Sequence, residues 1–564
     1  PDICRDFTIE KGAKLPIYGY NVLKFHPFTG LTVEGTLEVS GAMSGGVYFT
    51  SLKDDRGYDS NADKDASKPL AGDWNGILFT GEGTGYLNGA QILYAGAQRV
   101  ASGSWRSGGL MVGGTATPNL ESCIIAYSDK SAVTVFDAAK PTVRGSILRS
   151  AEWPVIVQST EALGLTLELN SYQKMKYSGI KVEANELKSG KTLTIKANHY
   201  IPYVMNNFLV EKGAKLTIQG GTILKFQPFS VLTVRGDLVA NTSIAEESIL
   251  FTSDASNVNG DSNGDGPNGK PEAGNWGGLV FEGEGTGEFN AVGISYAGSQ
   301  KVVNGSWRDG AVTIAGDAYA NFFFSSISHS LGSALTFLDQ GAFTSRQLGI
   351  YHTEWIGKTY SPHAIPAVMD IANYESVQHK AIKFEFRDIP AGSDAIIDGE
   401  WLPGLVFVSN SLNIPSNAAL TFRYATVKFE PGSQVIVKGQ LNAFDDPGYI
   451  STVFTSFKDD YEGDTNGDGS QTKPAAGDWV GFVFIDSANG TLETERIDYA
   501  GAQTVVAGAW RSAAIVTADR SYPMFRRLEI SNSAGDGILV LGQANPSPAT
   551  GIKYTNIAGV SYNR

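Results

Sequence analysis

The chain has 564 residues, of which 42% are hydrophobic, 18% are charged and 66 are glycine. This length suits several domains or one extended solenoid, and the high glycine content with few charges favours turn-rich β-structure over helices. A formal net charge of −14 argues against a nucleic-acid partner, because phosphates would be repelled, and it favours divalent cations.

One long sequence pattern occurs three times. The tryptophan of Gly72-Asp73-Trp74 recurs as Trp276 and Trp479, at offsets of 202 and 203 residues (276−74 and 479−276). We therefore divide the chain into three repeats, residues 1–200, 201–405 and 406–564, the last one shortened and ending in a strand-like tail. Whatever chemistry one repeat carries should exist in three copies, which disfavours an enzyme.

Short strands separated by turn residues are predicted along each repeat. In the first repeat they begin at 22–25 and 31–37, where apolar side chains alternate and Gly35 breaks the second run into two strands. Further strands follow roughly every ten residues, at 77–79, 91–94, 123–125, 133–136 and 155–157. No sustained helical periodicity interrupts them.

Strands at this spacing suit either β-sandwiches or a parallel β-helix. Sandwich domains of about 100 residues would give a shorter repeat than the observed one. A β-helix of about 22 residues per coil can instead stack about nine irregular coils into one repeat. We therefore expect an all-β fold, a parallel β-helix (solenoid) of three tandem repeats of about 200 residues each.

The order of motifs in each repeat resembles that of a known group of proteins. In the first repeat the series is Leu31–Leu37, Phe49-Thr50-Ser51, an Asp/Asn/Gly-rich loop, Gly72-Asp73-Trp74 and Tyr94-Ala95-Gly96. It resembles the right-handed parallel β-helix modules of large secreted or cell-surface bacterial and archaeal proteins. Members of that group resemble adhesins, surface-layer components and, more distantly, pectate-lyase-like enzymes. The resemblance covers most of all three repeats and implies a right-handed β-helix outside the cell.

An acidic loop precedes the tryptophan in every repeat. Its first aspartate always follows the serine of Phe-Thr-Ser by eight residues (59−51, 261−253 and 464−456). Oxygen-bearing side chains on alternate residues, with glycine allowing a tight wrap, are what Ca²⁺ selects. We expect one structural Ca²⁺ per repeat, which would order the loop. The expected ligands are Asp59, Asn61, Asp63, Asp65 and Asp73 in the first repeat, Asp261, Asn263, Asp265 and Asn275 in the second, and Asp464, Asn466, Asp468 and Asp478 in the third.

The loops depart from the EF-hand pattern. Only Glu272, in the second repeat, supplies the glutamate that an EF-hand has at its twelfth position. Ca²⁺ takes six to eight oxygens, so further ligands are needed, either beside the tryptophan or upstream at Asp55, Asn257 and Asp460. The alternative is a solvated turn, since Asp, Asn and Gly are ordinary turn formers. Repetition in a fixed register favours calcium.

A second tryptophan, followed by arginine, also recurs in each repeat. If exposed, such a pair would give a sugar-stacking platform beside a guanidinium. Alternatively, the tryptophan packs over a coil and the arginine pairs with a loop carboxylate, which is the interpretation we favour. We expect tighter packing still for Trp74 and its equivalents. The candidate glycan-binding residues are Trp105, Arg106, Trp307, Arg308, Trp510 and Arg511.

Catalytic motifs are weak. The six histidines show no metal-ligand spacing, and no phosphate-binding loop with its lysine is present. Polysaccharide lyases and glycoside hydrolases use carboxylates or Ca²⁺ ligands beside a base. Here every such element is triplicated, and no repeat shows a unique added carboxylate cluster. We expect no catalysis, with a polysaccharide lyase or glycoside hydrolase as the enzymatic alternative.

Two further features concern bonding and location. Cys4 and Cys123 are not repeated, so they form either one disulfide or two unpaired thiols. The sequence has no run of about 18 apolar residues, and we expect no membrane span. The tail at 551–557 either folds back as a cap or adds a strand to another copy, which would give a head-to-tail homo-oligomer through the terminal strands.

Taken together, these patterns predict an extracellular, calcium-stabilised structural protein without catalysis, such as an adhesin, a surface-layer component or a filament subunit. The main alternative is a polysaccharide-binding module or adhesin that uses the Trp-Arg pairs. Its partner would be a cell-surface or matrix polysaccharide.

Overall fold

The computed structural model describes residues 1–564 except 42–44, 65, 199–200, 243–246, 366–367, 401, 403–404, 445–451, 494, 548–549, 561 and 564. It divides into two compact units, residues 1–276 with 291–294, and residues 277–290 with 295–564. The division falls inside the second sequence repeat. Within the described residues the named elements are strands, apart from one short 3-10 helix, η1 (Glu161–Gly164).

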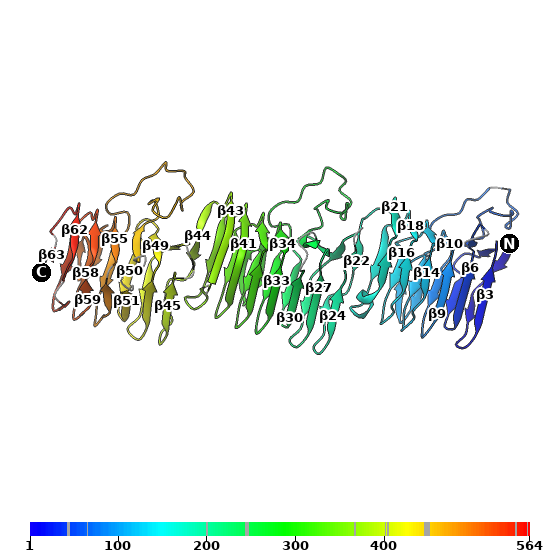
Figure 1. The fold of residues 1–564 in the computed structure, drawn as a ribbon, viewed down its shortest axis with the longest axis horizontal. Helices are drawn as coiled ribbons and strands as arrows, with labels where there is room; N and C mark the ends of the chain where they lie inside the picture. Colours follow the sequence, from blue (N-terminus) through cyan, green and yellow to red (C-terminus); the bar gives the residue numbers. More distant parts are fainter. Residues whose placement is uncertain are drawn as a thin grey trace. The chain divides into compact units, whose positions relative to one another are not determined.

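In the first unit, each coil of the chain contributes three short strands, and successive coils stack in parallel (Figure 1). The first coil holds β2 (Phe7–Ile9), β3 (Lys14–Tyr18) and β4 (Val22–Phe25). The second holds β5 (Gly30–Val33), β6 (Thr36–Ser40) and β7 (Val47–Ser51), and the third holds β8 (Gly76–Phe79), β9 (Thr84–Asn88) and β10 (Ala90–Leu93).

Three further coils continue the same three ladders. Their strands are β13 (Leu110–Val112), β14 (Asn119–Glu121) and β15 (Ile124–Ala126), then β16 (Ser131–Val135), β17 (Thr142–Arg144) and β18 (Ile147–Arg149), then β19 (Trp153–Val157), β20 (Thr166–Glu168) and β21 (Ser171–Gln173). Beyond them lie β22 (Ile180–Val182), β24 (Thr192–Ile195), β25 (Tyr203–Met205), β27 (Lys215–Gln219), β28 (Ile223–Phe226) and β31 (Ile249–Ser253). Val133 pairs with Val155, 22 positions later, which matches the expected coil length.

Two coils of the first repeat are longer than this, and each carries one insertion. Leu31 pairs with Ile77, and the acidic loop fills the extra length between β7 and β8. Ile77 pairs with Leu110, and the extra residues form an antiparallel hairpin of β11 (Arg99–Ala101) and β12 (Ser104–Arg106). The loop and the hairpin are therefore side excursions from an otherwise regular stack.

The second unit is built in the same way. Its longest parallel ladder runs through β32 (Gly278–Phe281), β37 (Val312–Ile314), β40 (Ser333–Phe337), β42 (Trp355–Thr359), β44 (His379–Phe384), β46 (Val406–Ser409), β49 (Thr426–Phe429), β52 (Val453–Ser456), β55 (Arg496–Asp498), β60 (Glu529–Ser531) and β62 (Lys553–Thr555). Another holds β47 (Leu412–Ile414), β50 (Gln434–Val437), β53 (Gly481–Phe484), β58 (Ala513–Thr517) and β61 (Asp536–Val540). Its two hairpins are β35 (Gly298–Val303) with β36 (Ser306–Gly310), and β56 (Thr504–Val506) with β57 (Ala509–Arg511).

These long parallel sheets are consistent with the predicted parallel β-solenoid, and they exclude compact two-sheet sandwich domains. The C-terminal tail does not fold back across the strands. Its strand β62 pairs in parallel with β60 and thereby adds one more rung to the ladder. No helix in the described part of the chain is long and apolar enough to cross a membrane.

The interior is packed with aromatic and aliphatic side chains. Trp74 is fully buried and stacks on Phe25 of β4 at 4.3 Å between ring centroids. The pairs Trp276–Phe226 and Trp479–Phe429 repeat this distance within their own units. The indole nitrogen of Trp74 donates to the Leu93 carbonyl at 2.8 Å. The predicted packing of these three tryptophans is confirmed.

The two cysteines are unpaired. Cys123 is buried and Cys4 is half-buried, and neither forms a disulfide. Burial raises the pKa of the Cys123 thiol to about 12, so this thiol stays protonated at neutral pH. Neither cysteine acts as a staple between coils.

The strand that follows each buried tryptophan begins at a position that only glycine can occupy. Gly481 has φ +112°, and a Cβ atom there would lie 2.2 Å from the Ala514 carbonyl oxygen of the next coil. Gly278 and Gly76 occupy the same place, 2.2 and 2.5 Å from the corresponding carbonyl oxygens. The neighbouring coil thus approaches the backbone too closely for a side chain.

We expect Gly481→Ala to lower the free energy of unfolding by about 2–4 kcal/mol, because it adds a steric clash to the cost of a positive φ. Gly508→Ala is the matched control, since Gly508 also has a positive φ (+75°) but no atom within 4 Å of its Cβ position. Chemical denaturation of both variants measures the difference. Equal losses of unfolding free energy in the two variants would show that the close approach of the neighbouring coil adds no steric penalty at position 481.

Candidate functional site

The most regular features outside the core are the acidic loops, which leave the stack after β7, β31 and β52. Figure 1 shows them as long excursions from the strands. Of the predicted metal ligands, Asp65 lies outside the described residues. The other predicted ligands lie within the described residues. Each loop is anchored by a buried lysine on a core strand.

In the third loop, the anchor is Lys428 of β49. Its side chain is fully buried, and its Nζ donates to the Asp459 carbonyl at 2.6 Å, the Gly463 carbonyl at 2.9 Å and Thr465 Oγ1 at 2.7 Å. All three ammonium protons are therefore used on the loop. Burial lowers the pKa of Lys428 to about 8, although nearby carboxylates, Asp459 first, act to raise it.

The other two loops use the same anchor. Lys225 of β28 donates to the Ser256 carbonyl at 2.6 Å, the Gly260 carbonyl at 2.7 Å and Ser262 Oγ at 2.9 Å. Lys24 of β4, also fully buried, donates to the Tyr58 carbonyl. Sequence reasoning missed these lysines. The available signal was a lysine at the third position of an apolar strand in all three repeats.

The first aspartate of each loop organises the backbone that follows it. Asp464 accepts hydrogen bonds from the amides of Gly467 at 2.7 Å and Gly469 at 2.8 Å. Asp261 does the same with Gly264 and Gly266, at 2.7 and 2.9 Å. The loop thus wraps around its own carboxylate.

The middle positions of the loops are tied to one another. Asn466 Nδ2 donates to Asp468 Oδ2 at 2.9 Å, and Asn263 does the same with Asp265 at 2.8 Å. Asn61 and Asp63 repeat the contact at 2.8 Å. Each amide therefore turns its nitrogen toward the second carboxylate.

The aspartates beside the buried tryptophans have a different partner. Asp478 forms an ion pair with Lys458 at 2.8 Å, and Asp73 forms one with Lys53 at the same distance. In the second repeat the two equivalent positions hold Ala255 and Asn275, so both charges are absent together. In the first and third repeats, this ion pair joins the start of the loop to its end.

Some loop oxygens are left for another ligand. Asp59 Oδ1, Asn61 Oδ1 and Asn257 Oδ1 are buried and accept no hydrogen bond. Within the described ranges, no group of three or more His, Cys, Asp or Glu side chains is arranged to hold a metal ion. A set that mixes carboxylate and amide oxygens, such as Asp59, Asn61 and Asp63, still has the oxygen chemistry that Ca²⁺ prefers.

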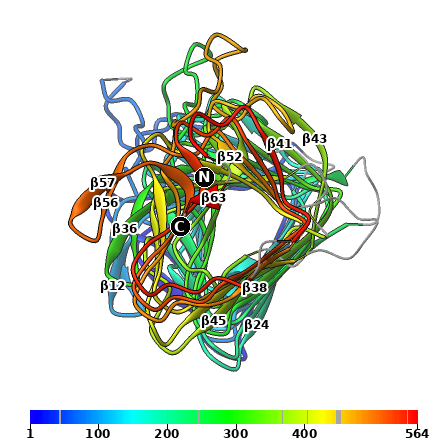
Figure 2. The same ribbon diagram turned by 90° about the vertical axis from the view of Figure 1, so that its left-hand side faces the viewer.

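The hairpins present the second tryptophan to solvent. Trp105, Trp307 and Trp510 are 70%, 65% and 68% exposed, so the expectation that they pack over a coil is wrong. Each faces a valine across the hairpin, as in the Trp105–Val100 pair, and these valines are also more than half exposed. In the second unit, β36 and β57 stand out on the same side of the coils (Figure 2).

The arginines after these tryptophans point the other way, toward the coils. Arg106 lies 4.0 Å above the Phe136 ring and donates to Gln158 Oε1. Arg308 lies 3.9 Å above the Tyr360 ring. The expected pairing of arginine with a loop carboxylate is wrong for these two, because each guanidinium stacks on an aromatic ring instead. The third arginine, Arg511, lies opposite Thr504 in its hairpin.

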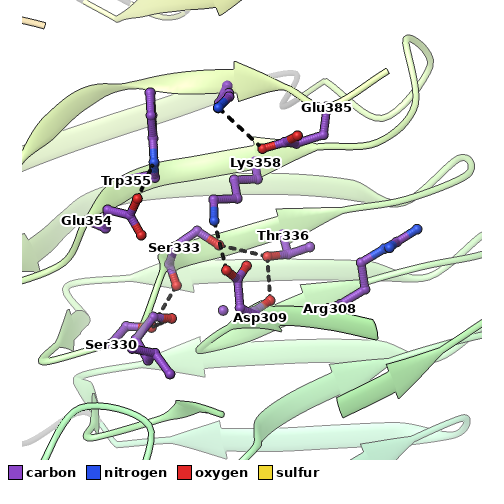
Figure 3. Close-up of polar contacts among 12 residues, drawn as sticks. Arg308, Asp309, Ser330, Ser333, Thr336, Glu354, Trp355, Lys358 and Glu385 are labelled. Carbon is purple, nitrogen blue, oxygen red and sulfur yellow. Dashed lines mark hydrogen bonds and ion pairs between the residues drawn. The ribbon is translucent and has the colours of Figure 1, made fainter. Parts of the chain in front are cut away.

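Under each of the first two hairpins lies a pair of buried hydroxyls. Ser333 and Thr336 are 2.8 Å apart, and Thr336 Oγ1 donates to the Asp309 carbonyl at 2.9 Å (Figure 3). In the first repeat, Ser131 and Thr134 make the same contact at 2.6 Å, and Thr134 donates to the Ser107 carbonyl. These hydroxyls fix the last residues of the hairpin to the coil below.

At the base of its hairpin, the second repeat also has charged side chains. Lys358 of β42 forms an ion pair with Asp309 at 2.8 Å, and both side chains are largely buried (Figure 3). Lys301 Nζ donates to the Gly310 carbonyl at 2.7 Å, and burial lowers its pKa to about 7. The first repeat holds Ser107 and Ile156 in place of Asp309 and Lys358. Sequence reasoning found no such added carboxylate, because its partner lies 49 residues away.

No protein-family model matches this chain, and no curated protein matches it. The function of this chain is therefore inferred from the arrangement of its own residues.

We expect Lys428→Met to release the third acidic loop, because the Asp459 and Gly463 carbonyls would lose their donor. The free energy of unfolding should fall by about 2–4 kcal/mol, the cost of leaving two buried acceptors unpaired. Limited proteolysis should then cut within residues 459–478. Lys438→Met, at an exposed lysine of the same repeat, is the control. Equal protease resistance of the two variants would contradict the anchoring role.

We expect Asp309→Ser to lower the free energy of unfolding by about 3 kcal/mol, since it strands the positive charge of Lys358. Adding Lys358→Ile should recover most of that loss, because the double variant recreates the pair found in the first repeat. A double-mutant cycle measured by chemical denaturation gives the coupling. Strictly additive losses would show that the two side chains do not depend on each other.

Proposed function

We propose that this chain is an extracellular or cell-surface binding protein without catalytic activity. In this proposal, a right-handed parallel β-helix of three tandem repeats presents one tryptophan hairpin per repeat to a cell-surface or matrix polysaccharide. The observation that carries it is the exposure of Trp105, Trp307 and Trp510, each about two-thirds open to water. That exposure favours a binding role over a purely architectural one.

The chemistry of the hairpin suits a sugar. An indole ring beside a valine gives a flat apolar surface on which the C–H face of a pyranose can stack, while the indole N–H can donate to a hydroxyl. Exposed apolar groups that recur at one structural position point to a partner rather than to chance. Three copies on one chain would let weak single contacts add up on a polymer.

The absence of catalysis is part of the same proposal. Its support is the triplication of the loops and hairpins, together with the ion pairing of Asp309, a carboxylate that the second repeat adds. Asp309 is held by Lys358 at the base of a hairpin, where it stabilises the backbone. A secreted or surface location accords with a function on extracellular polymers.

We expect the triple variant Trp105→Ala, Trp307→Ala and Trp510→Ala to lose at least tenfold in affinity for any polysaccharide that the wild type retains on a glycan array. Its melting temperature should stay unchanged, because the indoles are exposed. The control replaces three other exposed aromatic residues, Tyr18, Tyr58 and Tyr522, with alanine. Wild-type glycan binding by the triple variant would refute the proposal. Loss of self-association in mass photometry instead would favour a homo-oligomer or filament.

We also propose that each acidic loop holds one structural Ca²⁺. The support is the wrap of the backbone around the first aspartate and the buried, unpartnered oxygens of Asp59, Asn61 and Asn257. The loops carry several carboxylates each, and the anchoring lysine offsets one charge of each cluster. A bound cation would offset more and would supply the electrostatic stabilisation that holds the carboxylates together.

We expect removal of Ca²⁺ with a chelator to lower the melting temperature and to increase protease cutting within 54–73, 256–275 and 459–478. The double variant Asp464→Asn and Asp468→Asn should lose one of three Ca²⁺ ions by isothermal titration and elemental analysis. Asp486→Asn, outside the loops, is the control. Identical stability and cutting with and without chelator would remove the calcium assignment.

A further inference from the structure

A cavity opens beside the 3-10 helix η1 in the first unit. Its volume is about 530 Å³, within the range of roughly 300–1,000 Å³ seen for ligand pockets. One side is formed by the end of β19 and η1, and the other by residues 183–188 and the strand β24. This segment falls where the first two repeats resemble each other least, so the threefold pattern does not account for it.

The lining combines an apolar floor with a polar rim. Leu187 and Leu193 form the floor and are 3% and 7% exposed. A pyranose has the matching surface, since its ring faces carry C–H groups and its edge carries hydroxyls. The polar groups of the rim suit the hydroxyls of such a ring. The rim offers the amide of Asn185 and the hydroxyls of Thr192 and Thr194, whereas the hydroxyls of Ser159 and Thr160 already donate to the Asp137 and Glu186 carbonyls.

The formal charges of the side chains that line the cavity cancel. Three lysines and three glutamates line it, and two of the glutamates already have partners. Glu183 pairs with Lys181 at 2.7 Å, and Glu186 pairs with Lys188 at 3.4 Å. A charged ligand would find no net complement in this cavity, so a neutral one fits better.

A chain of polar contacts joins the cavity to the first tryptophan hairpin. Gln158, on the cavity wall, accepts a hydrogen bond from Arg106 and donates to Glu183 Oε2 at 2.9 Å. Arg106 directly follows the exposed Trp105. The second repeat has Tyr360 in place of Gln158 (360−158=202), so this connection belongs to the first repeat.

We propose that this cavity binds one or two residues of a neutral oligosaccharide, as a subsite next to the Trp105 hairpin. The inference rests on the proposed polysaccharide-binding function and narrows it to neutral sugars. It also gives the first repeat a second binding site, in addition to its hairpin.

The test uses the full chain and titration calorimetry with defined probes. These are disaccharides and hexasaccharides of glucose, mannose and N-acetylglucosamine, with a galacturonic acid hexasaccharide as the charged comparison. Thr192→Trp fills the cavity from an exposed strand position. Lys215→Trp is the matched control, since Lys215 is the exposed register partner of Thr192 on the next strand and does not line the cavity. Asn185→Ala is a milder second variant.

We expect at least one neutral disaccharide to bind the wild type and Lys215→Trp equally, and to bind Thr192→Trp at least tenfold more weakly. Asn185→Ala should weaken it by about threefold. Equal binding by Thr192→Trp and Lys215→Trp would overturn the proposal, as would equal affinity for the galacturonic acid probe.

The two proposals fail in different ways. If the triple tryptophan variant loses polysaccharide binding while no disaccharide binds the wild type, the cavity assignment is wrong and the hairpin function stands. If a disaccharide binds and Thr192→Trp abolishes it while the triple variant still binds polymer, the cavity assignment holds and the hairpin function is wrong.

Discussion

The constraint that governs this molecule is the return of every coil to the register of the one before it. Parallel pairs such as Val133–Val155 leave room for about 22 residues per coil, and the inward side chains of one coil rest on those of the next. A longer segment cannot be absorbed within the stack, because its backbone groups would lose their partners. It has to leave sideways and come back at the same height. The acidic loops and the hairpins are such excursions, and they carry the clustered aspartates and the exposed tryptophans.

A loop of about twenty residues needs an anchor. In this chain the anchor is a positively charged lysine inside the apolar core. Lys24, Lys225 and Lys428 lie on core strands, yet each ammonium group donates to loop carbonyls, and those of Lys225 and Lys428 also donate to a loop hydroxyl. A buried charge is tolerated when hydrogen bonds replace its lost water. The lysine therefore couples two parts that would otherwise be independent, the stack and the loop. The first two hairpins are held by stacked guanidinium groups and buried hydroxyl pairs, and the second also by the Lys358–Asp309 ion pair.

The fold was predictable from the sequence to a large extent, because period-2 runs, turn residues and coil length are local signals. The three buried tryptophans were predictable for the same reason, since each directly precedes a strand. The second set, Trp105 and its equivalents, was predicted wrongly. Sequence alone does not show that a tryptophan lies on a two-stranded hairpin, where cross-strand pairing turns Trp105 and Val100 toward water.

The loops show what sequence can and cannot locate. The turn around Asp464 could be expected from its Asp, Asn and Gly residues, because Asx hydrogen bonds are local. The role of Asp478 was not visible, since its ion pair with Lys458 spans 20 positions along the chain. The same holds for the anchor, as Lys428 meets Thr465 37 positions later. Contacts between coils depend on the register of the whole stack, which a single pattern does not specify.

Six of the nine tryptophans divide into two environments, which gives this protein an internal optical signal. Trp74, Trp276 and Trp479 are sealed against phenylalanine rings, whereas Trp105, Trp307 and Trp510 stand in water. The fluorescence of the first set reports whether the interior is intact. The emission of the second set responds to quenchers and to anything that covers the hairpins. Occupancy and integrity can thus be followed separately in one unlabelled sample.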